Sequence, residues 1–251
     1  MLSKAITTTP VAGRLHSTWD RAGVPGPGAF DSTLNGVILE APIAGAIPFD
    51  NPVSGNTYLN RFFVSASTGN GIIMLADRLW HNGGFTITST SAQNITSPTW
   101  PARDANGTTN GDGVFLGIEV SAQTGAGTPT ITVSYTNSEG TSGRTGTNSD
   151  ATTSTSPIGS FFRIGLQAGD RGVRSVQSVT LSATWTSGTI NLVAYRPIAV
   201  VPIYGTDIPG AVDTLTGGLP RLFNNSVLWT LFQQSATGAF RLNGAVQVTQ
   251  G

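Results

Sequence analysis

The chain has 251 residues, of which only 10% are charged, and it contains no cysteine and two histidines. Its 13 basic and 13 acidic residues cancel to a formal net charge of zero, so it lacks the clustered positive charge that binds nucleic acid or an anionic membrane surface. The absence of cysteine excludes a disulfide framework and thiolate chemistry, and the scarcity of titratable groups argues against an enzyme.

The N-terminal residues 1–33 have no regular hydrophobic period, and the Gly/Pro run at residues 23–28 cannot form a helix or a central strand. They nevertheless carry Leu15, Trp19 and Phe30, which a disordered tail would usually lack. We therefore expect an extended arm that docks on its own domain or on a neighbour, with these three residues contacting a partner and Trp19 as the main anchor. The first ten residues lack the apolar core of a signal peptide.

Residues 34–204 alternate short β-prone runs with turns, which predicts a β-sandwich or jelly-roll-like domain. The expected strands include residues 34–40, 71–76, 85–90, 114–120 and 131–135. Residues 179–185 and 190–195 flank a tight turn at 186–188 and give the clearest hairpin pattern. The apolar run at 71–76 is too short to span a bilayer, and the Gly/Ser/Thr-rich residues 139–156 predict an exposed, mobile loop.

Residues 205–251 predict a C-terminal β extension that packs on the domain or on a neighbour. It contains two apolar runs, at 227–232 and 240–248, and residues 211–222 could hold one turn of helix. No other segment has a helical period, so the predicted fold class is all-β.

Asp77 and His81 are the best candidates for a catalytic carboxylate and imidazole. Residues four apart in a strand share a face but lie ~13 Å apart, too far for a direct hydrogen bond, and the chain has no Gly-x-Ser-x-Gly motif. A polar pair at a strand end is the favoured interpretation.

Residues 104–112 alternate oxygen-bearing side chains with glycines, as calcium-binding loops do. Asp104, Asn106, Asn110 and Asp112 would supply the side-chain ligands of a Ca²⁺ ion. The loop lacks the spacing and the terminal glutamate of an EF-hand, and Asn-Gly and Asp-Gly are common turn dipeptides, so a plain turn is the alternative.

Two further groups have a structural and a binding interpretation. Asp170, Arg171 and Arg174 predict a salt-bridge network or a subunit contact, with anion binding as the second choice. Among the tryptophans, Trp185 is in phase with a buried strand face and belongs to the core, whereas Trp100, flanked by prolines, is the one most open to a ligand such as a glycan.

Several stretches together resemble a family of tailed-bacteriophage virion structural proteins. They are residues 17–29 (STWDRAGVPGPGA), 76–85 (ADRLWHNGGF), 97–104 (SPTWPARD), 110–113 (NGDG), 124–137 (TGAGTPTITVSYTN), 165–178 (GLQAGDRGVRSVQS), 218–223 (GLPRLF) and 248–251 (VTQG). No catalytic residue is attached to these stretches, so the resemblance implies a structural role in the virion.

The predicted function is a capsid decoration (cement) protein that stabilises the phage head by bridging capsomers. Its expected partners are the major capsid protein and copies of itself, as a homotrimer, and its expected location is the virion, assembled in the host bacterial cytoplasm. The alternatives are a tail, neck or fibre-attachment component and a host-glycan-binding module built from Trp100 and the 104–112 loop.

Overall fold

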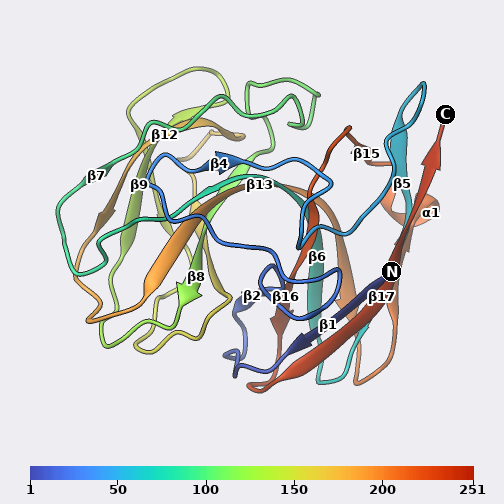
Figure 1. Ribbon diagram of the computed structural model, residues 1–251, viewed down its shortest axis with the longest axis horizontal. Coiled ribbons are helices and arrows are strands. Elements are labelled where there is room, and N and C mark those ends of the chain that lie inside the picture. Colours follow the sequence, from blue (N-terminus) through green and yellow to red (C-terminus); the bar gives the residue numbers. More distant parts are fainter. The chain divides into compact units, whose positions relative to one another are not determined.

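The computed structural model describes residues 1–251, and its regular structure is β except for one helical turn, α1, at Thr214–Gly217 (Figure 1). The all-β prediction is therefore confirmed, and α1 lies within residues 211–222, the one stretch whose sequence allowed a turn of helix. The strands are β1 Leu2–Ile6, β2 Leu15–Ser17, β3 Gly23–Val24, β4 Val37–Ile38, β5 Thr57–Ala66, β6 Gly71–Asn82, β7 Gln93–Asn94, β8 Phe115–Ala122, β9 Ile131–Asn137, β10 Arg144–Asn148, β11 Ser160–Gly165, β12 Val173–Leu181, β13 Thr189–Ile203, β14 Gly210–Asp213, β15 Arg221–Leu222, β16 Leu228–Gln234 and β17 Phe240–Gln250. No helix is long and apolar enough to cross a membrane.

The chain divides into two compact units whose boundaries differ from the predicted ones at 33/34 and 204/205. Unit 1 comprises Met1–Ala29, Glu40–Asp77 and Pro197–Gly251, and unit 2 comprises Phe30–Leu39 and Arg78–Arg196. Strands β6 and β13 each contribute residues to both units. Residues 1–29 of the predicted arm and the whole C-terminal extension are thus parts of unit 1, whereas residues 30–33 belong to unit 2. Strands β1 and β2 of the arm pair with β17 and β16 of the extension, and the extension pairs in turn with β5 and β6.

In unit 1, a six-stranded antiparallel sheet has the order β14-β5-β17-β1-β3, with β15 also paired to β5. Alternate residues of β1 face the core, so Leu2 and Ile6 are buried. Their neighbours in the apolar cluster include Phe62 and Val64 from β5 and Leu242 from β17. Strand β16 pairs with β2 and with the unit 1 part of β6. Both chain ends therefore dock on their own domain, which was one of the two expected arrangements.

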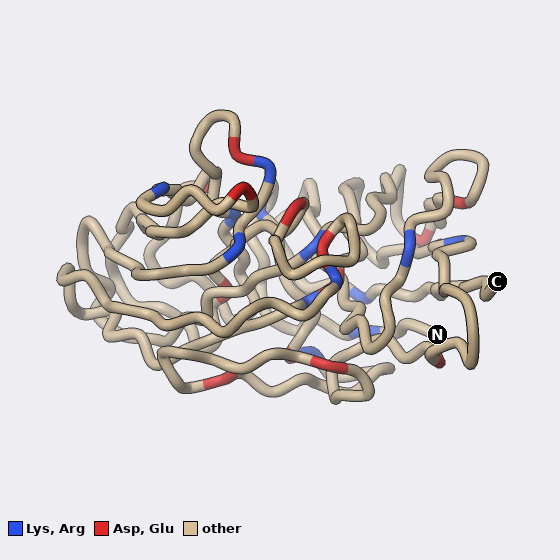
Figure 2. Tube along the Cα trace, turned by 90° about the horizontal axis from the view of Figure 1, so that it is seen from above, with Lys and Arg blue, Asp and Glu red and all other residues tan.

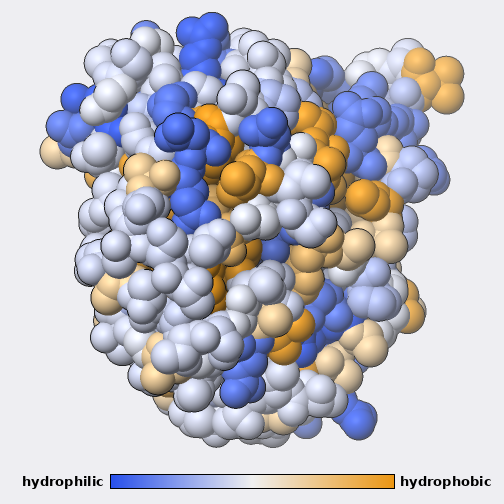
Figure 3. All heavy atoms as spheres, turned by 60° about the vertical axis from the view of Figure 1, so that its left-hand side comes forward, coloured by the Kyte–Doolittle hydropathy of each residue, from blue (hydrophilic) through white to orange (hydrophobic).

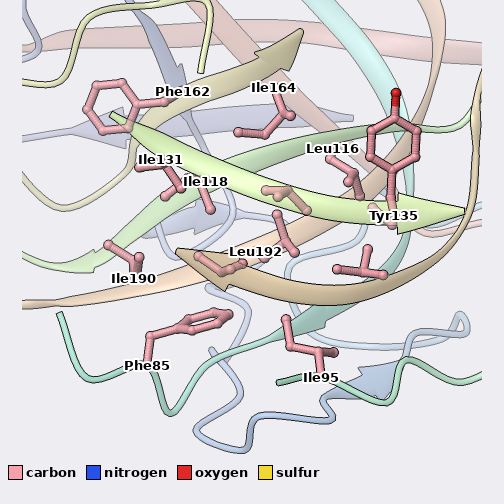
Figure 4. Close-up of a cluster of buried hydrophobic side chains, with 14 of the residues drawn as sticks. Phe85, Ile95, Leu116, Ile118, Ile131, Tyr135, Phe162, Ile164, Ile190 and Leu192 are labelled. Atoms are coloured by element: carbon pink, nitrogen blue, oxygen red, sulfur yellow. The ribbon is translucent and has the colours of Figure 1, made fainter. Parts of the chain in front are cut away.

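In unit 2, the antiparallel strand order is β13-β8-β11-β10-β9-β12-β7. The short β10 joins the two halves of this sheet, pairing with β11 at one side and β9 at the other. Apolar residues at alternate positions of both halves form one buried cluster, which gives a sandwich-like or barrel-like arrangement (Figure 4). They include Leu116, Ile118, Ile131, Tyr135, Phe162, Ile164, Ile190 and Leu192.

The predicted hairpin between residues 179–185 and 190–195 is wrong. Strand β12 ends at Leu181 and pairs with β9 and β7, whereas β13 pairs with β8. Trp185 lies in the connection between β12 and β13. Its side chain is fully buried in the core, and its backbone N–H donates to the carbonyl of Ile87 at 3.0 Å, so it makes no hairpin pairing with β13.

Three other local predictions need correction. Residues 85–90 are not a strand although they alternate, and the strand expected at 34–40 is reduced to the two residues of β4. The expected mobile loop at 139–156 contains β10, and Thr152 and Ser156 within it are buried and hydrogen-bonded. In this segment, hydrogen bonds of side-chain hydroxyl groups hold the backbone in place, as apolar contacts do in other parts of the chain.

Candidate functional site

Asp104 organises the loop at residues 104–112. Its buried carboxylate accepts hydrogen bonds at Oδ1 from the N–H groups of Asn106 (2.9 Å) and Thr108 (2.7 Å). Oδ2 accepts from the Thr108 hydroxyl (2.6 Å) and from the N–H groups of Gly111 (3.0 Å) and Asp112 (3.2 Å). Desolvation opposes ionisation, but these hydrogen bonds, led by those from Thr108, outweigh it and lower the pKa of Asp104.

The loop brings three of the four predicted calcium ligands together. The Asn106 amide donates to Asp112 Oδ2 at 2.9 Å, whereas the Asn110 side chain is exposed. Both oxygens of Asp104 already accept hydrogen bonds, as a loop-organising aspartate does. No group of three or more His, Asp or Glu side chains is placed to hold a metal ion, and calcium binding stays a prediction.

A second polar network surrounds Asp170. Arg144 donates to both carboxylate oxygens, at 3.0 Å and 2.9 Å, and Tyr135 (2.6 Å) and Asn137 (2.7 Å) donate one hydrogen bond each. Figure 4 shows the Tyr135 hydroxyl pointing away from the apolar cluster in which its ring is buried. The hydrogen bond from Arg144, ahead of those from Tyr135 and Asn137, lowers the pKa of Asp170 to about 2. Asp170 thus belongs to a structural salt bridge, although its partner is Arg144 rather than Arg171 or Arg174.

Close to these two networks, unit 2 has a cavity of about 330 Å³. Four separate segments line it: residues 97–99, the 104–112 loop, the end of β9 with the turn that follows, and the start of β12. The lining residues are Ser97, Pro98, Thr99, Thr109, Thr136, Gly140, Arg174 and Ser175. We call this cavity the hydroxyl pocket, since five of the eight residues carry hydroxyl groups.

Hydrogen bonds fix the walls of the hydroxyl pocket. The Ser97 hydroxyl accepts from the N–H of Val176 at 2.9 Å, which holds residues 97–99 against β12. Asn137 Oδ1 accepts from the N–H groups of Glu139 (3.2 Å) and Thr141 (2.8 Å), which shapes the turn. Gly140 in this turn has a backbone φ of +86°, a conformation that residues other than glycine rarely adopt. The pocket is therefore built on hydrogen-bonded backbone.

The hydroxyl pocket contains one formal charge, that of Arg174. Its guanidinium is exposed and makes no ion pair or hydrogen bond, and no acidic side chain lines the cavity. The neighbouring Arg171 instead lies 3.8 Å from both Asp112 and Glu139. Sequence patterns could not reveal this pocket, because its threonines and serines resemble ordinary solvent-facing residues of strands and loops.

Asp77 and His81 have separate hydrogen-bond partners. Asp77 is buried in unit 1, where it accepts from the Ser226 hydroxyl (2.7 Å) and the Val227 N–H (2.8 Å). In unit 2, His81 Nδ1 lies 2.8 Å from the guanidinium of Arg78, which also forms a buried ion pair with Glu119 at 2.6 Å. Burial, followed by the charge of Arg78, lowers the pKa of His81 to about 2. These contacts agree with the interpretation of Asp77 and His81 as polar residues of a strand end.

Trp100 is fully buried, so its predicted exposure to a ligand is wrong. Its ring centroid lies 5.3 Å from that of Trp80, and its indole N–H donates to the carbonyl of Val173 at 2.7 Å. The indole anchors its loop to β12, an arrangement that the flanking prolines do not reveal. The assignment of Trp185 to the core is confirmed.

Trp19 and Leu15 are also buried within the chain's own fold, and Phe30 is half-buried. The Trp19 indole N–H donates to the carbonyl of Ala29 at 2.8 Å, and its ring packs on the backbone of Gly28 and Gly45. In the folded chain these contacts leave no surface of Trp19 or Leu15 for a partner.

Comparisons with known proteins give little guidance. No family model matches the chain, and no curated protein does. Among solved structures, the VP2 subviral particle of infectious bursal disease virus aligns over 98% of this chain and 80% of its own, with 10% identity and a TM-score of 0.20. The Gx strain of the same virus aligns over 99% and 80%, with 11% identity and a TM-score of 0.17. At these TM-scores the likeness carries no argument about fold or function.

Proposed function

We propose that this protein is a virion structural protein of a tailed bacteriophage, and more specifically a capsid decoration protein that bridges capsomers. The sequence stretches that resemble such proteins support this role, as does an all-β chain poor in titratable groups. Charged residues are few and of interspersed sign (Figure 2), so adhesion to a protein lattice would depend on apolar contacts rather than on net charge.

The observation that carries the proposal is the uneven distribution of exposed large hydrophobic side chains between the two units. Nine of the eleven exposed large hydrophobic side chains belong to this unit. Five of them lie between residues 200 and 219, a set that we call the apolar patch: Val200 (46% exposed), Tyr204 (71%), Ile208 (52%), Leu215 (94%) and Leu219 (50%). Exposed large apolar side chains that gather on one surface mark interaction sites in soluble proteins, and we propose that these five side chains form such a site.

A cavity of about 240 Å³ adjoins the apolar patch. Ile198 and Val200 of β13 and Val212 of β14 line one part of it, and the turn of α1 with Gly217 lines another. Such a cavity can receive an apolar side chain of a neighbouring subunit, as interface anchors require.

In this role the protein would bind the assembled lattice in preference to free capsid subunits. Mass action then shifts the equilibrium towards the assembled shell. Association into a homotrimer would present three copies of the apolar patch to neighbouring capsomers. The major capsid protein and further copies of this chain are thus the proposed partners.

The first experiment measures the number of copies per virion relative to the major capsid protein by quantitative mass spectrometry. Hundreds of copies support decoration of the lattice. A dozen or a few dozen copies would place the protein in the tail, neck or fibres, and its absence from the particle would refute the structural role.

A second experiment tests the apolar patch. Tyr204→Ser combined with Leu215→Ser should reduce binding to undecorated capsids at least tenfold, because two exposed anchors are lost. Val37→Ser with Leu34→Ser provides the matched control, since both residues are exposed hydrophobics of unit 2. Equal loss in the two double variants would show that the apolar patch is not the lattice contact.

The alternative of a glycan-binding module is no longer supported by Trp100, which is buried. The hydroxyl pocket is the feature that favours a ligand site.

A further inference from the structure

We infer that the hydroxyl pocket binds an acidic saccharide, whose carboxylate pairs with Arg174 and whose hydroxyl groups face the serines and threonines of the walls. This site goes beyond the proposed structural role and does not depend on it. It lies in unit 2, whereas the apolar patch lies in unit 1.

Arg174 supplies the reason for a carboxylate. Its guanidinium has no partner within the protein. The acidic side chains of the neighbouring segments pair with other arginines: Asp170 with Arg144, and Asp112 and Glu139 with Arg171. A guanidinium presents a planar fork of N–H donors that matches a carboxylate in bidentate geometry. One positive charge balances one carboxylate, whereas a phosphate monoester, with up to two negative charges at neutral pH, would remain under-neutralised here.

The hydroxyl groups supply the reason for a saccharide. Those of Thr99, Thr109 and Thr136 make no hydrogen bond within the protein. The Ser175 oxygen accepts from the Gln177 amide at 2.9 Å and keeps its own proton to donate. A hydroxyl group both donates and accepts, so this lining complements a ligand with several hydroxyl groups better than an inorganic anion.

The surroundings of the hydroxyl pocket agree with this assignment. The volume of about 330 Å³ lies at the lower end of the range for small-molecule sites. Figure 3 brings forward the side of the molecule on which β7, β9 and β12 lie, and both hydrophilic and hydrophobic side chains reach the surface near the top of that face. The walls come from four segments held by Asp104, Asn137 and Ser97, so little ordering is needed on binding.

The pocket has no aromatic side chain on which a sugar ring could stack, so we expect a single site to bind in the millimolar range. Binding at a single site does not require a virion, but on a particle with many copies, as the proposed function expects, avidity would multiply that affinity. Weak single-site binding is therefore compatible with attachment to an acidic polysaccharide surface.

The test is a titration of the isolated ¹⁵N-labelled protein with methyl glucuronide, with methyl glucoside as the neutral matched ligand and sodium sulfate as the simple anion. Methyl glucuronide should shift the amide resonances of Thr109, Thr136, Gly140 and Ser175. Binding of methyl glucoside should be at least tenfold weaker, and that of sulfate weaker than that of methyl glucuronide.

Variants identify the guanidinium responsible. Arg174→Gln should weaken methyl glucuronide binding at least tenfold. The affinity of Arg174→Lys should lie between those of Arg174→Gln and the wild type, because lysine keeps the positive charge but lacks the two parallel N–H donors of the guanidinium. Arg171→Gln is the matched control and should bind as the wild type does. Equal affinity for glucoside and glucuronide, equal or tighter binding of sulfate, or full binding by folded Arg174→Gln would each overturn the inference. Because no capsid is involved, its failure would leave the proposed structural role unaffected.

Discussion

Asp104 accepts five hydrogen bonds with one buried carboxylate, so its charge stabilises all of residues 104–112. Asp104→Asn replaces an acceptor by a donor amide and should lower the free energy of unfolding by about 2–3 kcal/mol. Asn110→Ala, at an exposed side chain of the same loop, should change it by less than about 0.5 kcal/mol. Urea denaturation of the two variants measures both effects.

The same loop tests the predicted calcium site. If Ca²⁺ raises the melting temperature of the wild type but not that of Asn110→Ala, the ion binds through that side chain. With no ion in the loop, 5 mM Ca²⁺ should leave the melting temperatures of both proteins unchanged.

Asp170 predicts a contribution to stability that depends on pH. Its pKa is lowered to about 2, mainly by the hydrogen bond from Arg144, and is near 3.9 in an unfolded chain. The unfolded state therefore takes up a proton first as the pH falls. The stabilisation is fully present above about pH 4 and is lost as the pH falls towards 2.

Melting temperatures at pH 6, 4, 3 and 2 check this prediction. The difference between the wild type and Asp170→Asn should shrink between pH 4 and pH 2. A difference that stays constant over this range would show that the carboxylate charge does not stabilise the fold.

At the scale of elements, β1 is a central strand and not a detachable arm. It pairs with β17 on one side and with β3 on the other, and it buries Leu2 and Ile6. Deletion of residues 1–6 removes these side chains and exposes an edge of β17. We expect the melting temperature to fall by at least about 10 °C, since burial of two aliphatic side chains contributes several kcal/mol.

A matched control for this deletion is Ser3→Ala, which keeps the strand and changes a partly exposed side chain. Differential scanning calorimetry of both variants gives the comparison. If the truncated protein melts like the wild type, β1 is dispensable for the stability of the fold.

Sequence patterns predicted elements whose apolar residues alternate, such as those of β8, β9 and β17, because alternation directly reports one buried sheet face. The predictions from these patterns were wrong in two kinds of place. One is where a single buried side chain fixes the course of the backbone, as at Trp185, and the other is where a strand is built mainly from polar residues, as in β10. The aspartates of the 104–112 loop were recognisable as a group, but the hydroxyl pocket was not. Its lining residues are separated by up to 78 positions along the chain, between Ser97 and Ser175.

At the scale of the whole molecule, each unit has its own apolar cluster, around Phe62 in unit 1 and Ile118 in unit 2. Phe62→Ala should lower stability by about 3–5 kcal/mol and should raise amide hydrogen exchange mainly in β5, β17 and β1. Ile118→Ala should act mainly on β8, β9 and β12. Mass spectrometry of exchanged peptides distinguishes this result from a uniform rise over the chain, which would show that the two units open together.

The division into units also governs how the protein responds to cleavage. The chain passes from one unit to the other four times, between residues 29 and 30, 39 and 40, 77 and 78, and 196 and 197. A single proteolytic cut at any of these places leaves three covalent connections intact, so neither unit can be shed as a soluble fragment. Two of the passages run inside strands β6 and β13, where a protease finds no flexible linker. Resistance to the proteolytic release of either unit thus follows from the order of the segments along the chain.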